Sequence, residues 1–142
     1  MAGWRRGPSV PAMTSKTLPI PLAFAAVLAF DLTGLIVALA TGLDDLGPAL
    51  VVGTPLNAPF TFVAVQALAV LAATRYRAGA AAVAVLCLVS VVSGFADGGY
   101  GYDGLTAAEI GIQAGIVVST VILGGLAATA AARPRRRVSV AA

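Results

Sequence analysis

The stretch "VLAFDLTGL", from Val27 to Leu35, decides the fold class because it places one carboxylate, Asp31, inside a long apolar run. That run extends from about residue 20 to residue 42 and contains no other charged residue. At 1.5 Å per residue it matches the ~30 Å hydrocarbon core of a bilayer. The sequence around Asp31 therefore predicts a transmembrane helix with an acid near its middle.

Three further apolar segments follow, at about residues 58–74, 78–96 and 107–132. The chain is 59% hydrophobic and only 11% charged, whereas soluble domains carry about a quarter charged residues. No segment alternates polar and apolar residues as a barrel strand would, so lipid leaves helices as the expected structure. We therefore predict an all-α membrane protein, with four transmembrane helices in an up-down bundle.

The boundaries of these segments carry local signals. Thr106 and Glu109 have the spacing of a capping box at the start of the fourth helix. Asn57 is the expected N-cap of the second helix. The apolar stretch 49–55 before it is too short to span a bilayer, so we expect it at the outer interface. Tyr100 and Tyr102 are expected there too, as aromatic anchors.

The charged residues sort by connection. All nine Lys and Arg residues lie before the first segment, in the 75–77 loop or after the fourth segment. In the other two loops, every charged residue is an Asp or a Glu. The positive-inside rule then places both termini in the cytoplasm. The expected organisation is a flexible basic cytoplasmic tail (1–18, with Met13 as a second candidate start), a transmembrane domain (19–133) and a basic cytoplasmic tail (134–142). The basic tails are first a topology signal and second a contact for anionic lipid.

Asp31 has two interpretations. An acid inside a membrane segment normally faces a bundle interior or a wet cavity, and Gly34 lies on the same helix face as a small contact residue. Gln66, at similar depth in the second segment, is the expected hydrogen-bond partner. Because no basic residue lies at that depth, we expect Asp31 to carry its proton at neutral pH. It then serves either as a proton- or cation-binding group or as a structural hydrogen-bonding group between helices.

Other polar and small residues mark the third and fourth segments. Cys87, Ser90, Ser93 and Asp97 share one helix face, which indicates either a polar path toward Asp31 or serines bonded to their own helix. Gln113 is a further intramembrane polar candidate. "GIQAG" places Gly111 and Gly115 in a GxxxG motif, which predicts a helix contact within the bundle or with a second copy.

Function is constrained mainly by what the sequence lacks. It has no histidine and one cysteine, so no metal site, cofactor or disulfide is expected. The first interpretation is a non-enzymatic membrane subunit or scaffold, and the alternative is a small proton-coupled transporter using Asp31. An intramembrane enzyme ranks last. The expected partners are the lipid bilayer and a second copy or another membrane subunit, not nucleic acid. Composition is typical of high-GC bacteria, which predicts a bacterial cell membrane.

Overall fold

The computed structural model describes residues 19–98, 100 and 103–133, and these residues form five α-helices. The predicted tails at 1–18 and 134–142, and Tyr102, lie outside the described residues. The all-helical prediction is confirmed for the described part, where the other regular feature is an isolated bridge between Thr54 and Asn57. The helices are α1 (Pro19–Thr41), α2 (Leu46–Val51), α3 (Phe60–Ala73), α4 (Arg77–Ala96) and α5 (Ala107–Ala132).

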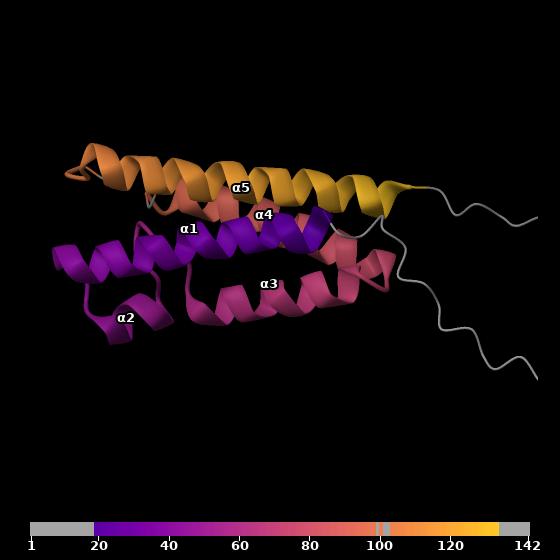
Figure 1. Ribbon diagram of the computed structural model, residues 1–142, viewed down its shortest axis with the longest axis horizontal. Coiled ribbons are helices and arrows are strands. Elements are labelled where there is room, and N and C mark those ends of the chain that lie inside the picture. Colours follow the sequence, from indigo (N-terminus) through magenta and orange to yellow (C-terminus); the bar gives the residue numbers. More distant parts are fainter. Residues whose placement is uncertain (1–18, 99, 101–102, 134–142) are drawn as a thin grey trace, which may run out of the picture.

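The four longer helices lie side by side along one axis, as Figure 1 shows. Helix α5 packs against both α1 and α4, and α3 packs mainly against α4. The short helix α2 lies beside the C-terminal part of α1 (Figure 1). Three helices, α1, α4 and α5, are long and apolar enough to cross a membrane, and α3 is a shorter apolar helix.

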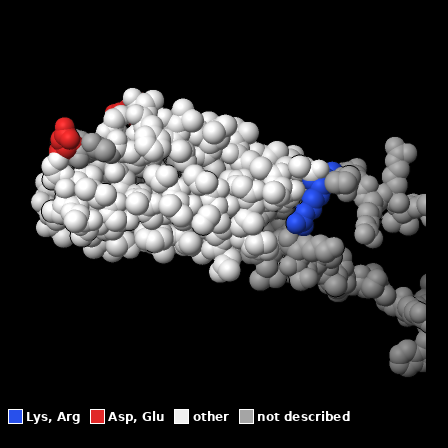
Figure 2. All heavy atoms as spheres, turned by 90° about the horizontal axis from the view of Figure 1, so that it is seen from above, with Lys and Arg blue, Asp and Glu red and all other residues white. Residues whose placement is uncertain are grey.

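Charge is separated between the two ends of the bundle (Figure 2). We call the end that carries Arg75, Arg77 and Arg133 the basic end, and the opposite end the acidic end. The face shown in Figure 2 is uncharged between them. Large apolar side chains cover the outside of the helices, including Leu22 (72% exposed) and Leu68 (66% exposed). Such a surface is compatible with a lipid environment and would be costly in water.

The helix expected at 58–74 is found as α3, which begins two residues later and ends one residue earlier, but the second apolar segment that α2 and α3 form together is broken by residues 52–59. Helix α3 has 14 residues and is therefore about 21 Å long, too short for a ~30 Å hydrocarbon core. The remaining length beside α1 is occupied by helix α2 and by residues 52–59 (Figure 1). We call residues 52–59 the mid-bundle turn. In and just after the stretch expected at the outer interface, Ala49 and Leu56 are fully buried, whereas Val51 and Val52 are exposed. The position of this stretch relative to the membrane surface stays a prediction.

The apolar core fills the basic half of the bundle. It contains Phe24 of α1, Val70 of α3, Val83 of α4 and Leu123 of α5, with their buried neighbours. In the acidic half, where α3 is missing, the mid-bundle turn takes its place. The two halves are therefore built differently: one by apolar packing, the other around irregular backbone.

Two predicted helix starts have different outcomes. The capping box of α5 is confirmed, because the Thr106 side chain accepts from the Glu109 N–H while the Glu109 side chain accepts from the Thr106 N–H. The N-cap prediction for Asn57 is wrong, because α3 begins two residues later with Pro59 at the N-cap and no side-chain cap. The Asn57 side chain instead bonds within the mid-bundle turn.

Candidate functional site

The mid-bundle turn folds back on itself between Thr54 and Asn57. The two residues exchange backbone hydrogen bonds, at 3.0 Å from Thr54 N and 3.2 Å from Asn57 N. The Thr54 hydroxyl donates to Asn57 Oδ1 at 2.5 Å and accepts from the Leu56 N–H at 3.1 Å. Gly53 precedes them with φ +85°, a conformation that favours glycine. The turn is therefore specified by its own Gly-Thr-Pro-Leu-Asn sequence.

Every backbone N–H from Thr54 to Pro59 is either bonded or absent. Pro55 and Pro59 have none, and Thr54, Leu56 and Asn57 donate within the turn. The remaining donor, Ala58 N–H, has a partner outside the turn. This complete pairing matters because a buried backbone group without a partner costs about 1–3 kcal/mol.

Asp31 supplies that partner. Its Oδ1 accepts the Ala58 N–H at 2.6 Å, and its side chain is 8% exposed. The sequence correctly places Asp31 inside the bundle, but its bond is to the backbone of the turn. The Gln66 amide, expected to donate to Asp31, instead donates to Cys87 Sγ at 3.4 Å. Asp31 therefore connects the middle of α1 to the start of α3.

Gly34 allows the turn to approach α1. A methyl group on Gly34 would overlap the backbone carbonyl of Leu56, and Gly34 is buried. The predicted small contact face of α1 is thus real, but it meets the backbone of the turn instead of another helix. Only glycine leaves room for a backbone at this distance.

Helix α5 holds the other side of the turn. Gln113 is buried, and its Nε2 donates to the Pro55 carbonyl at 3.0 Å. Asp31 and Gln113, which come from different helices, thus bind the turn from two sides, one as acceptor and one as donor. The sequence identified both as intramembrane polar candidates but gave no reason to bring them to the same segment.

The two glycines of the GxxxG motif lie in different surroundings. An added Cβ on Gly115 would overlap the Phe30 ring, so Gly115 is at the contact between α5 and α1. Gly111 is exposed, and a Cβ there would meet no atom within 4 Å. The predicted contact is therefore found for Gly115 and not for Gly111 within one chain. A contact of Gly111 with a second copy stays a prediction.

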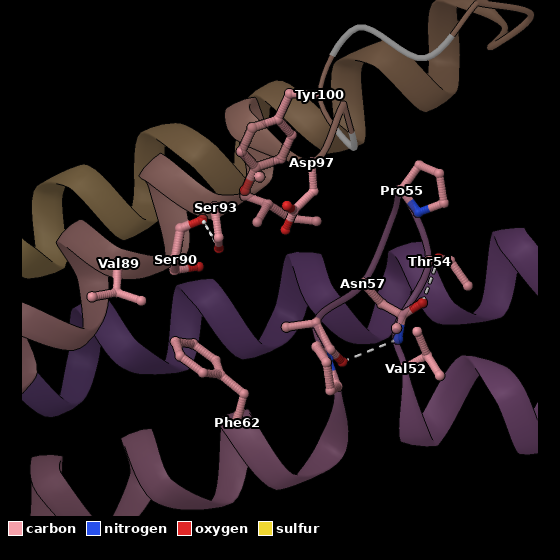
Figure 3. Close-up of a pocket in the computed structure, with 15 residues that line it drawn as sticks. Val52, Thr54, Pro55, Asn57, Phe62, Val89, Ser90, Ser93, Asp97 and Tyr100 are labelled. Carbon is pink, nitrogen blue, oxygen red and sulfur yellow. Dashed lines mark hydrogen bonds between the residues drawn. The ribbon is translucent and has the colours of Figure 1, made fainter.

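A cavity of about 470 Å³ lies between the mid-bundle turn and the acidic half of α4. We call it the turn cavity. Figure 3 shows Thr54 and Asn57 on the turn side, Phe62 on the α3 side, and Ser90, Ser93, Asp97 and Tyr100 on the α4 side. Residues lining it are Val52, Gly53, Thr54, Pro55, Asn57, Ala58, Pro59, Phe62, Val89, Ser90, Ser93, Gly94, Asp97, Tyr100 and Ile116.

The polar face predicted on the third long helix lines this cavity in part. Ser90, Ser93 and Asp97 all contribute to the wall, whereas Cys87 is buried in the apolar core. Ser93 also donates to the Ser90 carbonyl at 3.2 Å, as a helical serine commonly does with its own helix. The bond of a serine to its own helix is therefore found for Ser93, whereas a polar path toward Asp31 stays a prediction.

A second, much smaller void lies beside Asp31. Its volume is about 10 Å³, close to the minimum for one water molecule, and Asp31, Gln66, Ser90 and Thr120 supply its polar lining. Ser90 and Ala58 line both the void and the turn cavity. Asp31 is thus separated from the turn cavity by one layer of residues.

Tyr100 forms part of the cavity wall and is not free at the end of the bundle, where an anchor was expected. It lies over Gly94 and makes an edge-to-face contact with Phe95, with ring centroids 5.0 Å apart. Burial raises the pKa of the Tyr100 phenol, and the Asp31 carboxylate adds to the rise. The phenol therefore stays neutral near pH 7 and can donate a hydrogen bond into the cavity.

The charge of the turn cavity has one sign. Asp97 is the charged residue in its described lining, which includes no Lys or Arg. Among the described residues, no group of three His, Cys, Asp or Glu side chains could hold a metal ion. The described site therefore combines mainly apolar walls with one carboxylate, two aromatic rings and several hydroxyl and amide groups.

Sequence reasoning missed the residues of the turn itself. Thr54 and Pro55 were assigned to an interfacial loop, and Asn57 and Pro59 to the start of the following helix, although together they form a segment that needs few outside hydrogen bonds. One signal could have found this turn. An apolar stretch that contains Gly, Thr, two prolines and Asn is poorly suited to helix, so its backbone N–H groups need other hydrogen-bond acceptors, and the preceding span offers a central acid.

No family model matches this chain, and neither a curated protein nor a solved structure matches it. The function is therefore argued from the turn cavity and the groups around it.

Proposed function

We propose that this chain is a small, non-enzymatic multi-pass membrane protein that binds a solute in the turn cavity. The proposal places the apolar outer surface of α1, α4 and α5 in lipid, which the length and composition of these helices support. The basic end then faces the cytoplasm, following the positive-inside rule, with both termini on that side. The turn cavity opens toward the opposite side of the membrane.

The observation that carries this proposal is the break in the second span. A bundle that serves only as a scaffold could use a continuous helix there, with every backbone hydrogen bond made locally. Instead the chain needs Asp31, Gln113 and Gly34 to accommodate the turn. Irregular backbone at membrane depth is tolerated where it is buried in protein or lines a cavity, and broken helices commonly surround transport and binding sites.

Cavity size and chemistry favour binding over catalysis. A volume of about 470 Å³ falls in the usual range of ligand pockets. The chain has no histidine, and the described lining pairs no second acid with Asp97. A general acid–base pair or an activated nucleophile, which most hydrolytic and transfer reactions need, therefore has no candidate there.

A second candidate function is proton-coupled transport, and the void beside Asp31 favours it. A carboxyl group one residue layer away from a solute cavity could exchange a proton through a single water held in that void. In this alternative Asp31 would release its bond to Ala58 when its charge changes, which would couple protonation to the position of the turn.

Access from the outside tests the proposed function. Ser93→Cys should react with a membrane-impermeant methanethiosulfonate added to the non-cytoplasmic side of intact spheroplasts, because Ser93 lines the turn cavity. Val118→Cys, which is exposed on α5 but outside the cavity, should not react, because lipid would surround it. Wild type gives the background, since Cys87 is buried. Labelling of Ser93→Cys only from the cytoplasmic side, or from neither side, would contradict the proposal.

A further inference from the structure

We propose that the turn cavity takes a small organic cation with an apolar body, with Asp97 as its counter-charge. The inference rests on the proposed function, because it assumes that the cavity is a binding site. It adds the chemical class of the ligand, which follows from how charge and aromatic rings are distributed around the space.

The charge argument comes first. Asp97 presents an acceptor-only group to the cavity, and the described lining offers no basic side chain to an anion. The wider surroundings have the same sign, because Asp44, Asp45 and Asp103 lie at the acidic end and the described Arg residues lie at the other end. An anion entering here would meet repulsion, whereas a cation would be attracted along the whole approach.

The aromatic rings provide the second argument. Phe62 lines the cavity from α3, and Tyr100 lines it from the segment after α4, on the opposite side in Figure 3. The Tyr100 ring, like that of Phe62, has an electron-rich face that attracts cations. An alkylammonium group placed between Asp97 and these rings would be bound both by charge and by the ring faces.

The rest of the wall defines the body of the ligand. Val52, Pro55, Pro59, Val89 and Ile116 are apolar and line the cavity together with Ala58. A fully hydrated metal ion would leave these surfaces without contacts. A compound with one cationic group and an apolar ring or chain matches both parts of the lining.

Protection of a cavity cysteine from alkylation tests this inference. Purified Ser93→Cys protein is treated with N-ethylmaleimide, a neutral reagent, in the presence of benzyltrimethylammonium, its neutral isostere neopentylbenzene, or benzenesulfonate. The cation should slow the reaction at a concentration at least about ten-fold lower than the other two compounds need, because only the cation gains from Asp97. Val89→Cys provides a second reporter in the same wall.

The carboxylate is tested with a matched pair of variants. Asp97→Asn should raise the protecting concentration of the cation about ten-fold, since it removes the charge and keeps the shape. Asp103→Asn, which removes an acid outside the cavity lining, should leave it nearly unchanged. Equal protection in the Asp97→Asn variant, or protection by the neutral or anionic probe at the same concentration as by the cation, would overturn the inference.

The outcomes separate this inference from the proposed function. If Ser93→Cys is labelled from the outside but the cation gives no protection, the ligand class is wrong and the outward-open cavity stands. If neither Ser93→Cys nor Val89→Cys reacts with a reagent from the outside, the proposed function fails and the inference fails with it.

Discussion

Gly34→Ala should destabilise the folded protein by at least about 3 kcal/mol, at the upper end of overpacking effects. The added methyl group would overlap the backbone carbonyl of Leu56, and a backbone cannot move aside as a flexible side chain can. The turn would have to leave α1, which would also break the bond from Ala58 to Asp31. Unfolding in mixed micelles, followed by circular dichroism, measures the loss.

Gly111→Ala is the matched control for this experiment. Both substitutions add one methyl group to a helical glycine, but a Cβ on Gly111 meets no atom of the chain. Its free energy of unfolding should stay within about 0.5 kcal/mol of wild type, or rise slightly because alanine favours helix. Equal effects of the two substitutions would show that the turn does not lie against Gly34.

Replacing Asp31 should separate its hydrogen bond from its charge. Asp31→Asn keeps an oxygen that can accept the Ala58 N–H, so we expect little loss of stability. Asp31→Leu removes the acceptor and leaves a buried N–H without a partner, which should cost about 2–3 kcal/mol. Unfolding measured under the same conditions as for Gly34→Ala gives the comparison.

The same variants distinguish the two candidate functions. If the chain is a binding protein, Asp31→Asn should still bind the cation that protects Ser93→Cys. If it is a proton-coupled carrier, Asp31→Asn should bind the cation but lose proton-driven uptake into liposomes. Equal stability losses for Asn and Leu at this position would argue against the hydrogen bond to Ala58 as the role of Asp31.

Much of the architecture could be predicted because it depends on long apolar runs and local signals. The helical class and the cap of α5 follow directly from composition and from the spacing of Thr106 and Glu109. The burial of Asp31 and Gln113 could be predicted too, because lipid strongly disfavours both side chains.

The partners of these residues could not be predicted, because they depend on backbone geometry that periodicity does not contain. A pattern of apolar residues indicates where a helix is favourable, but not where a chain leaves the helix and exposes an N–H. Asp31 was assigned to another side chain, Gln66, because both residues lie near the middle of their apolar segments. The turn cavity could not be predicted for the same reason, although the sequence did predict one of its walls, which carries Ser90, Ser93 and Asp97.

The central claim is that the second span is broken, so that α3 begins level with Asp31. Spin labels report this directly through their depth in the bilayer, measured by relaxation with oxygen and with a water-soluble nickel complex. Phe60→Cys, Leu32→Cys and Leu43→Cys, each in a Cys87→Ala background, place labels on three exposed positions: the start of α3, the residue after Asp31, and the loop just after α1 at the acidic end.

Leu43 follows the last residue of α1, Thr41, which is nine residues beyond Leu32 and therefore about 14 Å further along the helix. The broken span predicts that the label at position 60 is as deep as the label at position 32, near the bilayer centre. A label at position 60 as shallow as the label at position 43 would mean that the second helix starts at the membrane surface, which would contradict the account.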